Sequence, residues 1–532
     1  MAFTSAIFLL FFSVVCAVYF IVPIKHRWLV LLIASYLFYW QNSTYLVFVL
    51  AGMTAITWLT GLFLERQNLK KAYYLKLHAG NMNSSERKKY KFSVTRKKKM
   101  ILILGIIIDL GILLFFKYSN FFVGSSSSFF QLLGIKIQNF QLNILIPLGI
   151  SFYTLQAIGY MADIYWGKYP ADRNFLKFAL FMSYFPQIVQ GPIARYNRLA
   201  VQFKEGHALD FNRLKSGCQL ILWGFMKKLI LADRIGIVVD TVFKNYADYG
   251  GMILFISAIF YGFQIYADFS AGMDIATGIS QVFGINLEAN FRQPYFSKSM
   301  EDFWRRWHIT LGGWMKDYIF YPLSLSKKFA SLGKAARKIF GNYIGKRLPP
   351  FLAMFLVYFL VGFWHGPDWK YAVYGIWNGT IIATGILLQP LYKKGISVFH
   401  VKEASYGWRL FQALRTFFLC TIGRLFPKSA SCSIAFIMIQ NIFLHPMPWQ
   451  LVDGTIFALG LDGKDFCVAF FMVILLLLVD LAHEKNIQIR ERIAAQGIIF
   501  RWLIYWTAFF LILIFGIYGP AYNSSDFIYQ QF

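Results

Sequence analysis

Long runs of apolar residues, separated by shorter polar gaps, alternate along the whole 532-residue chain. A helix needs about 20 apolar residues to cross the hydrocarbon core of a bilayer, and the runs predict roughly ten to thirteen such helices, some of them re-entrant. The pattern therefore predicts an all-α, multi-pass membrane protein. We expect a single membrane domain over residues 1–532, with outer spans in 1–122 and 410–518 and a terminal tail at 520–532.

Composition excludes a typical water-soluble fold. Hydrophobic residues make up 58% of the chain and charged residues 15%, against about 45–50% and about 25% in globular proteins. The net charge of +28 would suggest nucleic acid in a soluble protein, but these cations cluster in the gaps between apolar runs. Such clusters are typical of cytoplasmic loops beside anionic headgroups, so we expect membrane lipids and no nucleic acid as partners. The five cysteines lack metal-like spacing, and no metal site is expected.

The distribution of lysine and arginine predicts an orientation. Twelve of these residues lie in 65–99, Lys25 and Arg27 follow the first apolar run, and the gap 41–43 is uncharged. Because positively charged loops stay in the cytoplasm, the N-terminus is expected outside. Basic residues in 485–501 precede the last apolar run, so both termini are predicted to be extracytoplasmic.

The region 285–348 combines charge with aromatic side chains, which is typical of helices lying at membrane depth against protein or a water-filled cavity. It contains His308, preceded by Trp304, Arg305, Arg306 and Trp307. At helical spacing Trp304 and His308 share a face, and the arginine pair is suited to bind a phosphate or carboxylate beside tryptophan rings. The alternative, which these residues alone favour, is an interfacial amphipathic helix with tryptophan and arginine anchors.

A second histidine, His365, ends an apolar run and follows Trp364. A titratable side chain at membrane depth indicates function, and a neutral imidazole is able to take a proton from an alcohol. Gly366 and Pro367 would end the helix there and leave room for a ligand. The alternative is a histidine that caps the last helical turn, where its charge favours the helix dipole.

Two aspartates are candidates for buried acids. Asp268 lies in an apolar run, and Asp317 follows the aromatic region around His308. Each is suited to pair with an arginine or to orient a histidine ring, and the alternative is a structural ion pair. Of the two readings, a structural ion pair is favoured for both.

The ordered set of motifs resembles the membrane-bound O-acyltransferase (MBOAT) family, and within it the alginate-type membrane subunits of bacteria. The matching pieces are 147–154 (PLGISFYT), 185–193 (FPQIVQGPI), 224–233 (GFMKKLILAD), 266–270 (YADFS), 290–292 (NFR), 303–309 (FWRRWHI), 317–318 with Pro322, and 364–366 (WHG). The resemblance implies a ring of transmembrane helices around a thin centre, with funnels on both faces and a core over about 140–390.

The resemblance also implies roles for residues. His365 matches the presumed catalytic base and His308 a second functional histidine. The remaining matched side chains would line the substrate channel or support it: Trp304, Arg305, Arg306, Trp307, Trp364, Asp268 and Asp317.

The last residues, 527–532 (FIYQQF), resemble the aromatic C-terminal motif of the alginate-type subfamily. A tyrosine of that motif has been proposed as an acyl relay, which would correspond to Tyr529. A phenol becomes a good nucleophile once a nearby base removes its proton. Gln530 stands where an aromatic residue is common, and the alternative is a tail without a role in the reaction.

The resemblance implies an O-acyltransferase of the bacterial cytoplasmic (inner) membrane. It would move an acyl group, expected to be acetyl from acetyl-CoA, to an extracytoplasmic polysaccharide together with an SGNH-like acetyltransferase. No tightly bound cofactor is expected. The alternatives are D-alanyl transfer to teichoic acid from a carrier protein, a transporter of lipid-linked sugars, and a structural membrane scaffold.

Overall fold

The computed structural model describes residues 1–79, 81–135, 141–518 and 527. Within these residues the chain is helical, and an isolated antiparallel bridge between Phe291 and Trp307 is the only β-type pairing. The helices group into two compact units, Met1–Lys215 with Ile279–Glu288 and Ser216–Gly278 with Ala289–Phe532. The single domain expected from the sequence stays a prediction.

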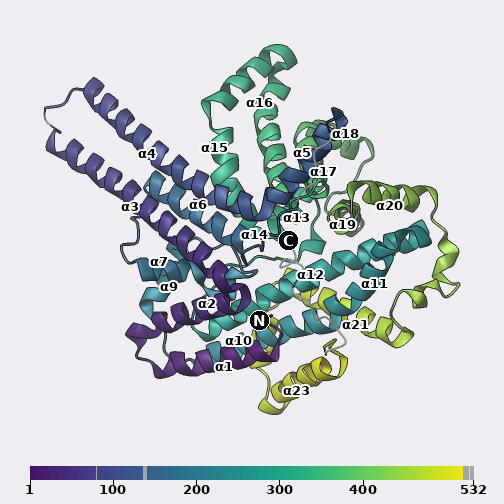
Figure 1. Cartoon of the computed structure of the whole chain (residues 1–532). Helices are drawn as coiled ribbons and strands as arrows, with labels where there is room; N and C mark the ends of the chain where they lie inside the picture. The colour runs from purple at the N-terminus through teal and green to yellow at the C-terminus, as the bar shows by residue number, and fades with distance from the viewer. Residues whose placement is uncertain (80, 136–140, 519–526, 528–532) are drawn as a thin grey trace. The chain divides into compact units, whose positions relative to one another are not determined.

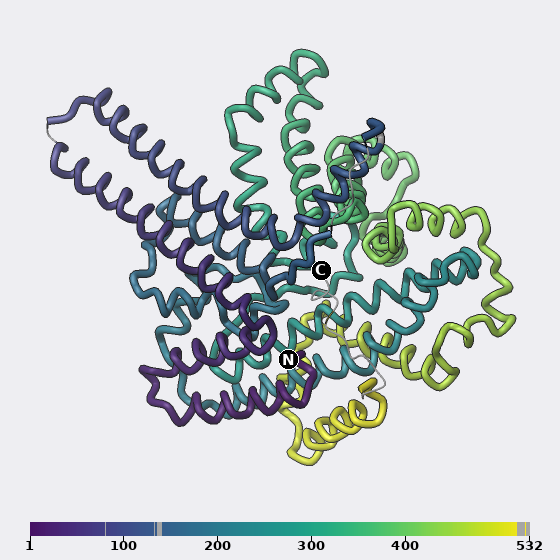
Figure 2. Tube along the Cα trace, in the orientation of Figure 1, coloured from purple at the N-terminus to yellow at the C-terminus, as the bar shows by residue number. Residues whose placement is uncertain are grey.

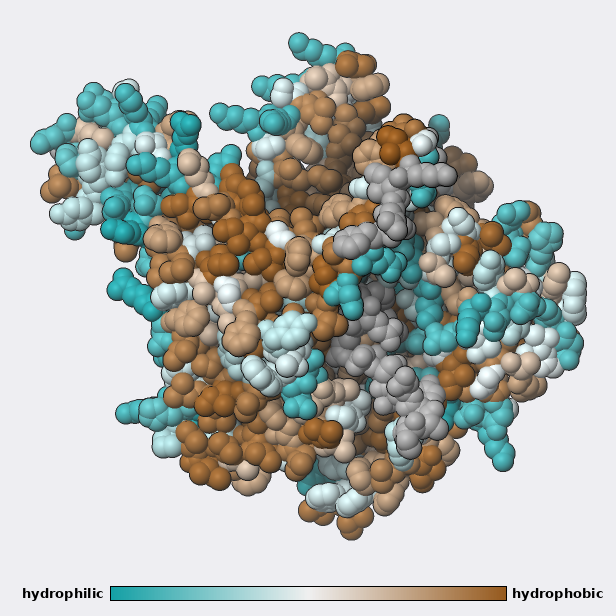
Figure 3. All heavy atoms as spheres, viewed as in Figure 1, coloured by the Kyte–Doolittle hydropathy of each residue, from teal (hydrophilic) through white to brown (hydrophobic). Residues whose placement is uncertain are grey.

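The first unit is built on a long helical hairpin, α3 (Val47–Leu77) and α4 (Ser84–Leu113), against which α6 (Ile150–Trp166) packs (Figure 1). Asn83 begins α4 through a capping box, in which its side chain and backbone exchange hydrogen bonds with Glu86. The tip of the hairpin is hydrophilic and its lower part is apolar (Figure 3), as the basic segment 65–99 predicts. The remaining helices of this unit are α1 (Ala6–Ile21), α2 (Arg27–Ser43), α5 (Ser119–Leu132), α7 (Phe175–Ser183), α8 (Phe185–Ile188) and α9 (Tyr196–Glu205).

The second unit carries both candidate histidines. Its longest helix, α16 (Lys327–His365), bends at Gly341, whose φ of 77° breaks the helical backbone. The two arms of α16 run antiparallel, as the trace in Figure 2 shows. The second arm packs on α17 (Trp369–Leu387), and α17 packs on α19 (Tyr406–Lys428).

Further elements complete the unit around these helices. Those nearest the histidines are α12 (Gly251–Val282), α13 (Met300–Arg306), α14 (Ile309–Met315), the π-turn η7 (Lys316–Phe320) and α15 (Tyr321–Ser324). The others are α10 (Phe211–Phe225), the π-turn η4 (Met226–Ala232), α11 (Asp233–Lys244), α18 (Gln389–Val398), α20 (Cys432–Leu444), α21 (Gly463–Glu484), α22 (Ile489–Ala494) and α23 (Ile498–Phe515).

The chain is a multi-pass membrane protein. Six helical stretches in the described part of the chain are long and apolar enough to cross a bilayer, or seven if α17 and α18, which meet at a 67° bend, form one broken span. The ten to thirteen crossings expected from the sequence stay a prediction. The stretch Ile24–Leu77 joins α2 and α3, which cover two of the expected runs, and other runs form helices shorter than 18 residues, such as Ala6–Ile21. The six stretches are Ile24–Leu77, Ser84–Gln131, Gly251–Val282, Lys327–His365, Gly463–Glu484 and Ile498–Phe515.

Candidate functional site

His308 lies at a break in the helical backbone, between α13 and α14. Helix α13 begins at the cap residue Ser299, whose hydroxyl accepts a hydrogen bond from the amide of Asp302, and it ends at Arg306. Trp307 is extended, and His308 has a φ of 49°, in the left-handed region that non-glycine residues seldom occupy. The predicted helix through Trp304 and His308 is therefore wrong, and these two residues do not share a helical face.

Pairing with a segment from earlier in the chain explains the break. The side-chain oxygen of Asn290 accepts hydrogen bonds from the backbone amide (3.0 Å) and hydroxyl (2.9 Å) of Thr310. The backbone carbonyl of Asn290 accepts from the amide of Ile309 at 3.0 Å, and the amide of Arg292 donates to the carbonyl of Arg306 at 2.9 Å. These bonds satisfy backbone groups that a continuous helix would otherwise have satisfied.

The His308 imidazole is fully buried. Its Nδ1 lies 3.3 Å from the side-chain oxygen of Asn290, and its ring centroid is 4.9 Å from that of Phe269. Burial, and then the proximity of His365, lower the pKa of His308 well below its usual range. The ring is therefore neutral at physiological pH.

The indole of Trp364 contacts both imidazoles. Its centroid is 5.9 Å from that of His308 and 5.2 Å from that of His365. His365 is the last residue of α16, and Asp368 caps the next helix by accepting a hydrogen bond from the amide of Lys370 at 3.0 Å. The structure thus brings the two predicted histidines together around one tryptophan.

His365 lines a small cavity of about 30 Å³. Such a volume holds about two water molecules, which is close to the size of an acetyl group. The other lining residues are Tyr261, Ile265, Trp307, Tyr371, Tyr374, Arg424 and Pro427. Of these, only Trp307 was expected from the sequence. Arg424 could also have been identified there, because it is an arginine within an apolar run.

A larger cavity of about 290 Å³ lies beside Trp304. Trp304 approaches Tyr374, which lines the small cavity, with their ring centroids 6.5 Å apart. The charged residues of the larger cavity, Glu301, Arg305 and Lys316, are exposed. Its other lining residues are Ile309, Leu311, Gly312, Gly313, Met315, Phe320, Met354, Val357, Tyr358 and Val361.

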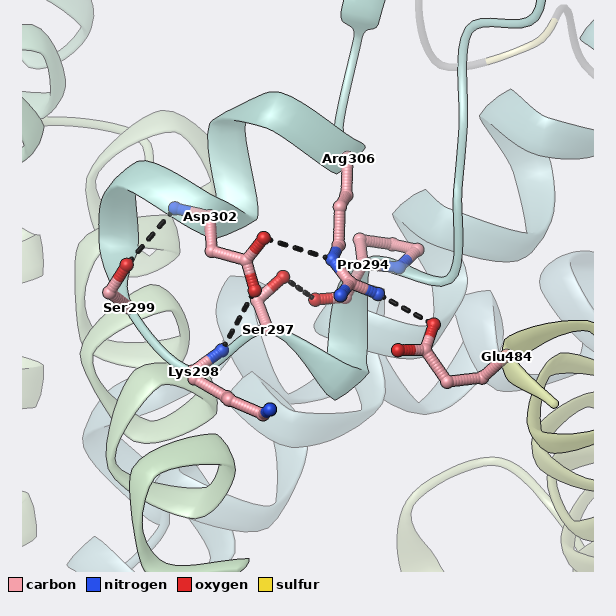
Figure 4. Close-up of polar contacts among 7 residues, drawn as sticks. All are labelled: Pro294, Ser297, Lys298, Ser299, Asp302, Arg306 and Glu484. Carbon is pink, nitrogen blue, oxygen red and sulfur yellow. Dashed lines mark hydrogen bonds and ion pairs between the residues drawn. The ribbon is translucent and has the colours of Figure 1, made fainter. Parts of the chain in front are cut away.

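The two arginines of the predicted anion-binding pair have carboxylate partners from the chain itself. Arg305 pairs with Glu301 on the exposed side of α13. Arg306 binds Asp302 (3.1 Å) and Glu484 of α21 (2.7 Å), as Figure 4 shows. Arg306 therefore links α13 to α21, while Arg305 lies at the edge of the larger cavity.

The predicted buried acids differ in their surroundings. Asp268 is buried and forms an ion pair with Lys228 at 2.7 Å, as the structural alternative expected. Lys228 also pairs with Asp233 at 2.9 Å. The prediction that Asp317 is buried is wrong: it is exposed on η7, whereas Trp314 of the preceding α14 is buried.

Of the C-terminal tail, Phe527 is described, and it is buried with its ring centroid 4.8 Å from Nζ of Lys228. Tyr529 lies outside the described residues, so its expected role stays a prediction. Among the residues that the structure does describe, no three histidine, cysteine or acidic side chains are placed to hold a metal ion.

Comparison with known proteins decides the family. The family model for membrane-bound O-acyltransferases matches residues 170–426. A probable alginate O-acetylase of Pseudomonas putida is 30% identical over 543 aligned residues, covering 100% of both chains. The chain belongs to the MBOAT family. It is an acyltransferase.

Two further relatives of this MBOAT extend the comparison. A probable alginate O-acetylase of Pseudomonas aeruginosa is 32% identical over 78% of this chain and 75% of its own length. A peptidoglycan O-acetyltransferase of Helicobacter pylori is 32% identical over 54% of this chain and 55% of its own length. Both histidines, Arg424 and every lining residue of the two cavities except Pro427 lie within the part of the chain that the MBOAT model matches.

Proposed function

We propose that this MBOAT takes an acetyl group from cytoplasmic acetyl-CoA and transfers it toward an extracytoplasmic polysaccharide, with His365 as the general base. The observation that carries the proposal is the position of His365 on an acetyl-sized cavity, in contact with the tryptophan that also contacts His308. A thioester is already activated for acyl transfer, so the chemical demand on the protein is proton transfer and positioning.

The reaction follows from these positions. The imidazole of His365 accepts the proton of an acceptor hydroxyl, and the oxygen attacks the thioester carbonyl carbon. The C–S bond then breaks, and the departing thiolate takes the proton back from His365, leaving an ester and a thiol. His308 acts as a positioning residue: it is neutral and fully buried, and its ring packs on Trp364, which packs on His365.

The larger cavity suits the donor. Its interior is mostly apolar, whereas Arg305 and Lys316 are exposed at its edge. Because Arg305 is paired with Glu301, Lys316 is the main positive charge that favours the phosphates of a nucleotide thioester. The apolar interior favours an uncharged arm carrying the acyl group. The basic first arm of α16 follows shortly after Lys316, and this positive charge favours a cytoplasmic position for the edge.

On the opposite side, the acyl group would pass to the polymer directly or through an SGNH-like acetyltransferase. This orientation rests on both termini being extracytoplasmic, in the cytoplasmic membrane of a bacterium. Tyr529 would then act as an acyl relay in the tail. Phe527, two residues before it, packs near Lys228 of η4.

Donor identity is tested with membrane vesicles that contain the purified chain. Labelled acetyl-CoA is supplied to the cytoplasmic face and, in parallel, carrier protein charged with labelled D-alanine. The proposal predicts ester-linked label only from acetyl-CoA. Label transferred from the carrier protein alone would overturn the acetyl donor in favour of D-alanylation, and flux of intact lipid-linked sugar without ester formation would favour a transporter.

A further inference from the structure

Arg424 is a buried cation that has no acidic partner among the described residues. Four lysines and arginines are buried in the described part of the second unit: Lys227, Lys228, Arg234 and Arg424. The first three have carboxylate partners, respectively Asp274 at 2.7 Å, Asp268 at 2.7 Å and Asp465 at 3.1 Å. No carboxylate among the described residues lies within 4.0 Å of the Arg424 guanidinium, which is 3% exposed.

Aromatic rings hold this guanidinium in place. Its carbon lies 5.3 Å from the ring centroid of Tyr295, 5.4 Å from Phe303 and 5.1 Å from Trp307. One terminal nitrogen, Nη1, donates a hydrogen bond to the Tyr295 hydroxyl at 3.1 Å. The other, Nη2, is buried and has no hydrogen-bond acceptor among the described residues. Ring stacking of this kind favours arginine over lysine, because only the guanidinium is planar.

A buried cation without a counter-charge is unfavourable unless an anion joins it. Arg424 lines the same cavity of about 30 Å³ as His365, so an anion bound there would have to be small and would lie near the proposed base. A nucleotide or a sugar exceeds this volume, whereas an acetyl group is close to it. The missing charge is therefore expected to arise on the acyl group itself.

We propose that Arg424 binds the acyl carbonyl oxygen as it becomes anionic during transfer, which rests on the proposed acetyltransferase function. When the acceptor oxygen adds to the carbonyl carbon, the π electrons move to the carbonyl oxygen, and they return when the C–S bond breaks. A fixed, water-poor cation stabilises that transient charge more than it stabilises the neutral thioester. Arg424 would therefore increase kcat more than it decreases KM.

Two kinds of variant separate this role from a contribution to folding. Arg424→Gln removes the charge, and Arg424→Lys keeps a charge but loses the planar group. In Gly262→Ala the charge and the hydrogen-bonding group both remain, but the added Cβ would lie 2.9 Å from Nη1 of Arg424 and so displaces the guanidinium. Arg415→Gln is the matched control, because Arg415 lies on the same helix and donates to the backbone carbonyl of Lys298 at 3.0 Å.

Binding is measured first and does not depend on activity. The full chain in detergent is melted in increasing sodium acetate, with sodium gluconate at equal ionic strength as an anion too large for the cavity. We expect acetate to produce a saturable rise in Tm of about 2 °C or more in the wild type and Arg415→Gln. The rise is expected to be absent in Arg424→Gln. Equal Tm values in acetate and gluconate for the wild type would overturn the anion site, whatever the donor proves to be.

Kinetics then test the role in the reaction. With acetyl-CoA as donor, Arg424→Gln is expected to lower kcat about 100-fold or more with KM changed by about threefold or less. Gly262→Ala is expected to lower kcat by a smaller factor, and Arg415→Gln to match the wild type. A folded Arg424→Gln or Gly262→Ala protein with wild-type kcat would overturn the role. If the wild type transfers no acetyl group from acetyl-CoA but still binds acetate through Arg424, the proposed donor is contradicted instead.

Discussion

The imidazole of His308 packs against the indole of Trp364 at a centroid distance of 5.9 Å, although His308 lies in the break between α13 and α14 and Trp364 lies in α16. Trp364 in turn contacts its neighbour His365 at 5.2 Å. Because one indole touches both rings, the position of His365 depends on the packing around His308. The two histidines therefore act as one structural unit, and several predictions concern the contacts that hold it.

Trp364→Leu is expected to reduce acetyl transfer by about 10-fold or more, because leucine leaves both imidazoles without the planar surface that positions them. Trp364→Phe keeps an aromatic face and is expected to retain most of the rate. Both are measured as ester-linked label per folded protein in vesicles. Equal rates for the leucine variant and the wild type would show that the indole does not position His365.

Asn290→Ala is expected to destabilise the chain by about 1–3 kcal/mol, because it leaves the buried amide and hydroxyl of Thr310 without their acceptor. It also releases the left-handed turn at His308, so activity should fall together with Tm. The thermal unfolding of the purified protein in detergent checks the first effect. Asn286→Ala, at an exposed position, serves as the control. An unchanged Tm would contradict the structural role of Asn290.

The lowered pKa of His308 makes stability depend on pH. The folded ring stays neutral, whereas the unfolded ring gains a proton below its ordinary pKa of about 6.5, so stability is lost as the pH falls below that value. The wild-type Tm should therefore fall more steeply between about pH 6.5 and 5 than the Tm of His308→Gln. His445→Gln, in an exposed loop, should keep the wild-type slope. Parallel curves for wild type and His308→Gln would contradict the burial of a neutral ring.

Asp268→Asn tests whether the buried ion pair is structural. The change weakens the pairing of Lys228, which keeps Asp233 as its other partner, and a loss of about 1–3 kcal/mol is expected. The activity of the fraction that remains folded should stay within about threefold of the wild type. A wild-type Tm with activity abolished would instead place Asp268 in the reaction.

Sequence reasoning located the histidines but not the contacts that hold them. His365 could be identified because burying a titratable residue at the end of an apolar run is energetically costly, and such a residue is visible in the local sequence. The break before His308 could not be found locally, because it depends on Asn290, which lies 18 positions earlier and pairs with it only in the folded chain. Local spacing favoured a continuous helix. Asp317 was expected to be buried because it follows the aromatic region, whereas it is exposed on η7.

Arg424 was missed for a related reason. An arginine within an apolar run is expected either to snorkel to the interface or to find an acid, and neither is visible from sequence. The rings around it come from one distant stretch, since Tyr295, Phe303 and Trp307 all precede it by more than 100 residues. The family resemblance, by contrast, rests on ordered motifs and could be predicted before any geometry was known.

His365 is proposed to remove the proton from the acceptor hydroxyl. The most direct test of this role is the rate of labelled ester formation by His365→Ala. Vesicles carrying this variant are compared with wild type and with His445→Ala, which changes an exposed loop histidine. The proposal predicts a loss of about 100-fold or more for His365→Ala, with the protein folded and His445→Ala at the wild-type rate. Ester formation by a folded His365→Ala protein at the wild-type rate would contradict it.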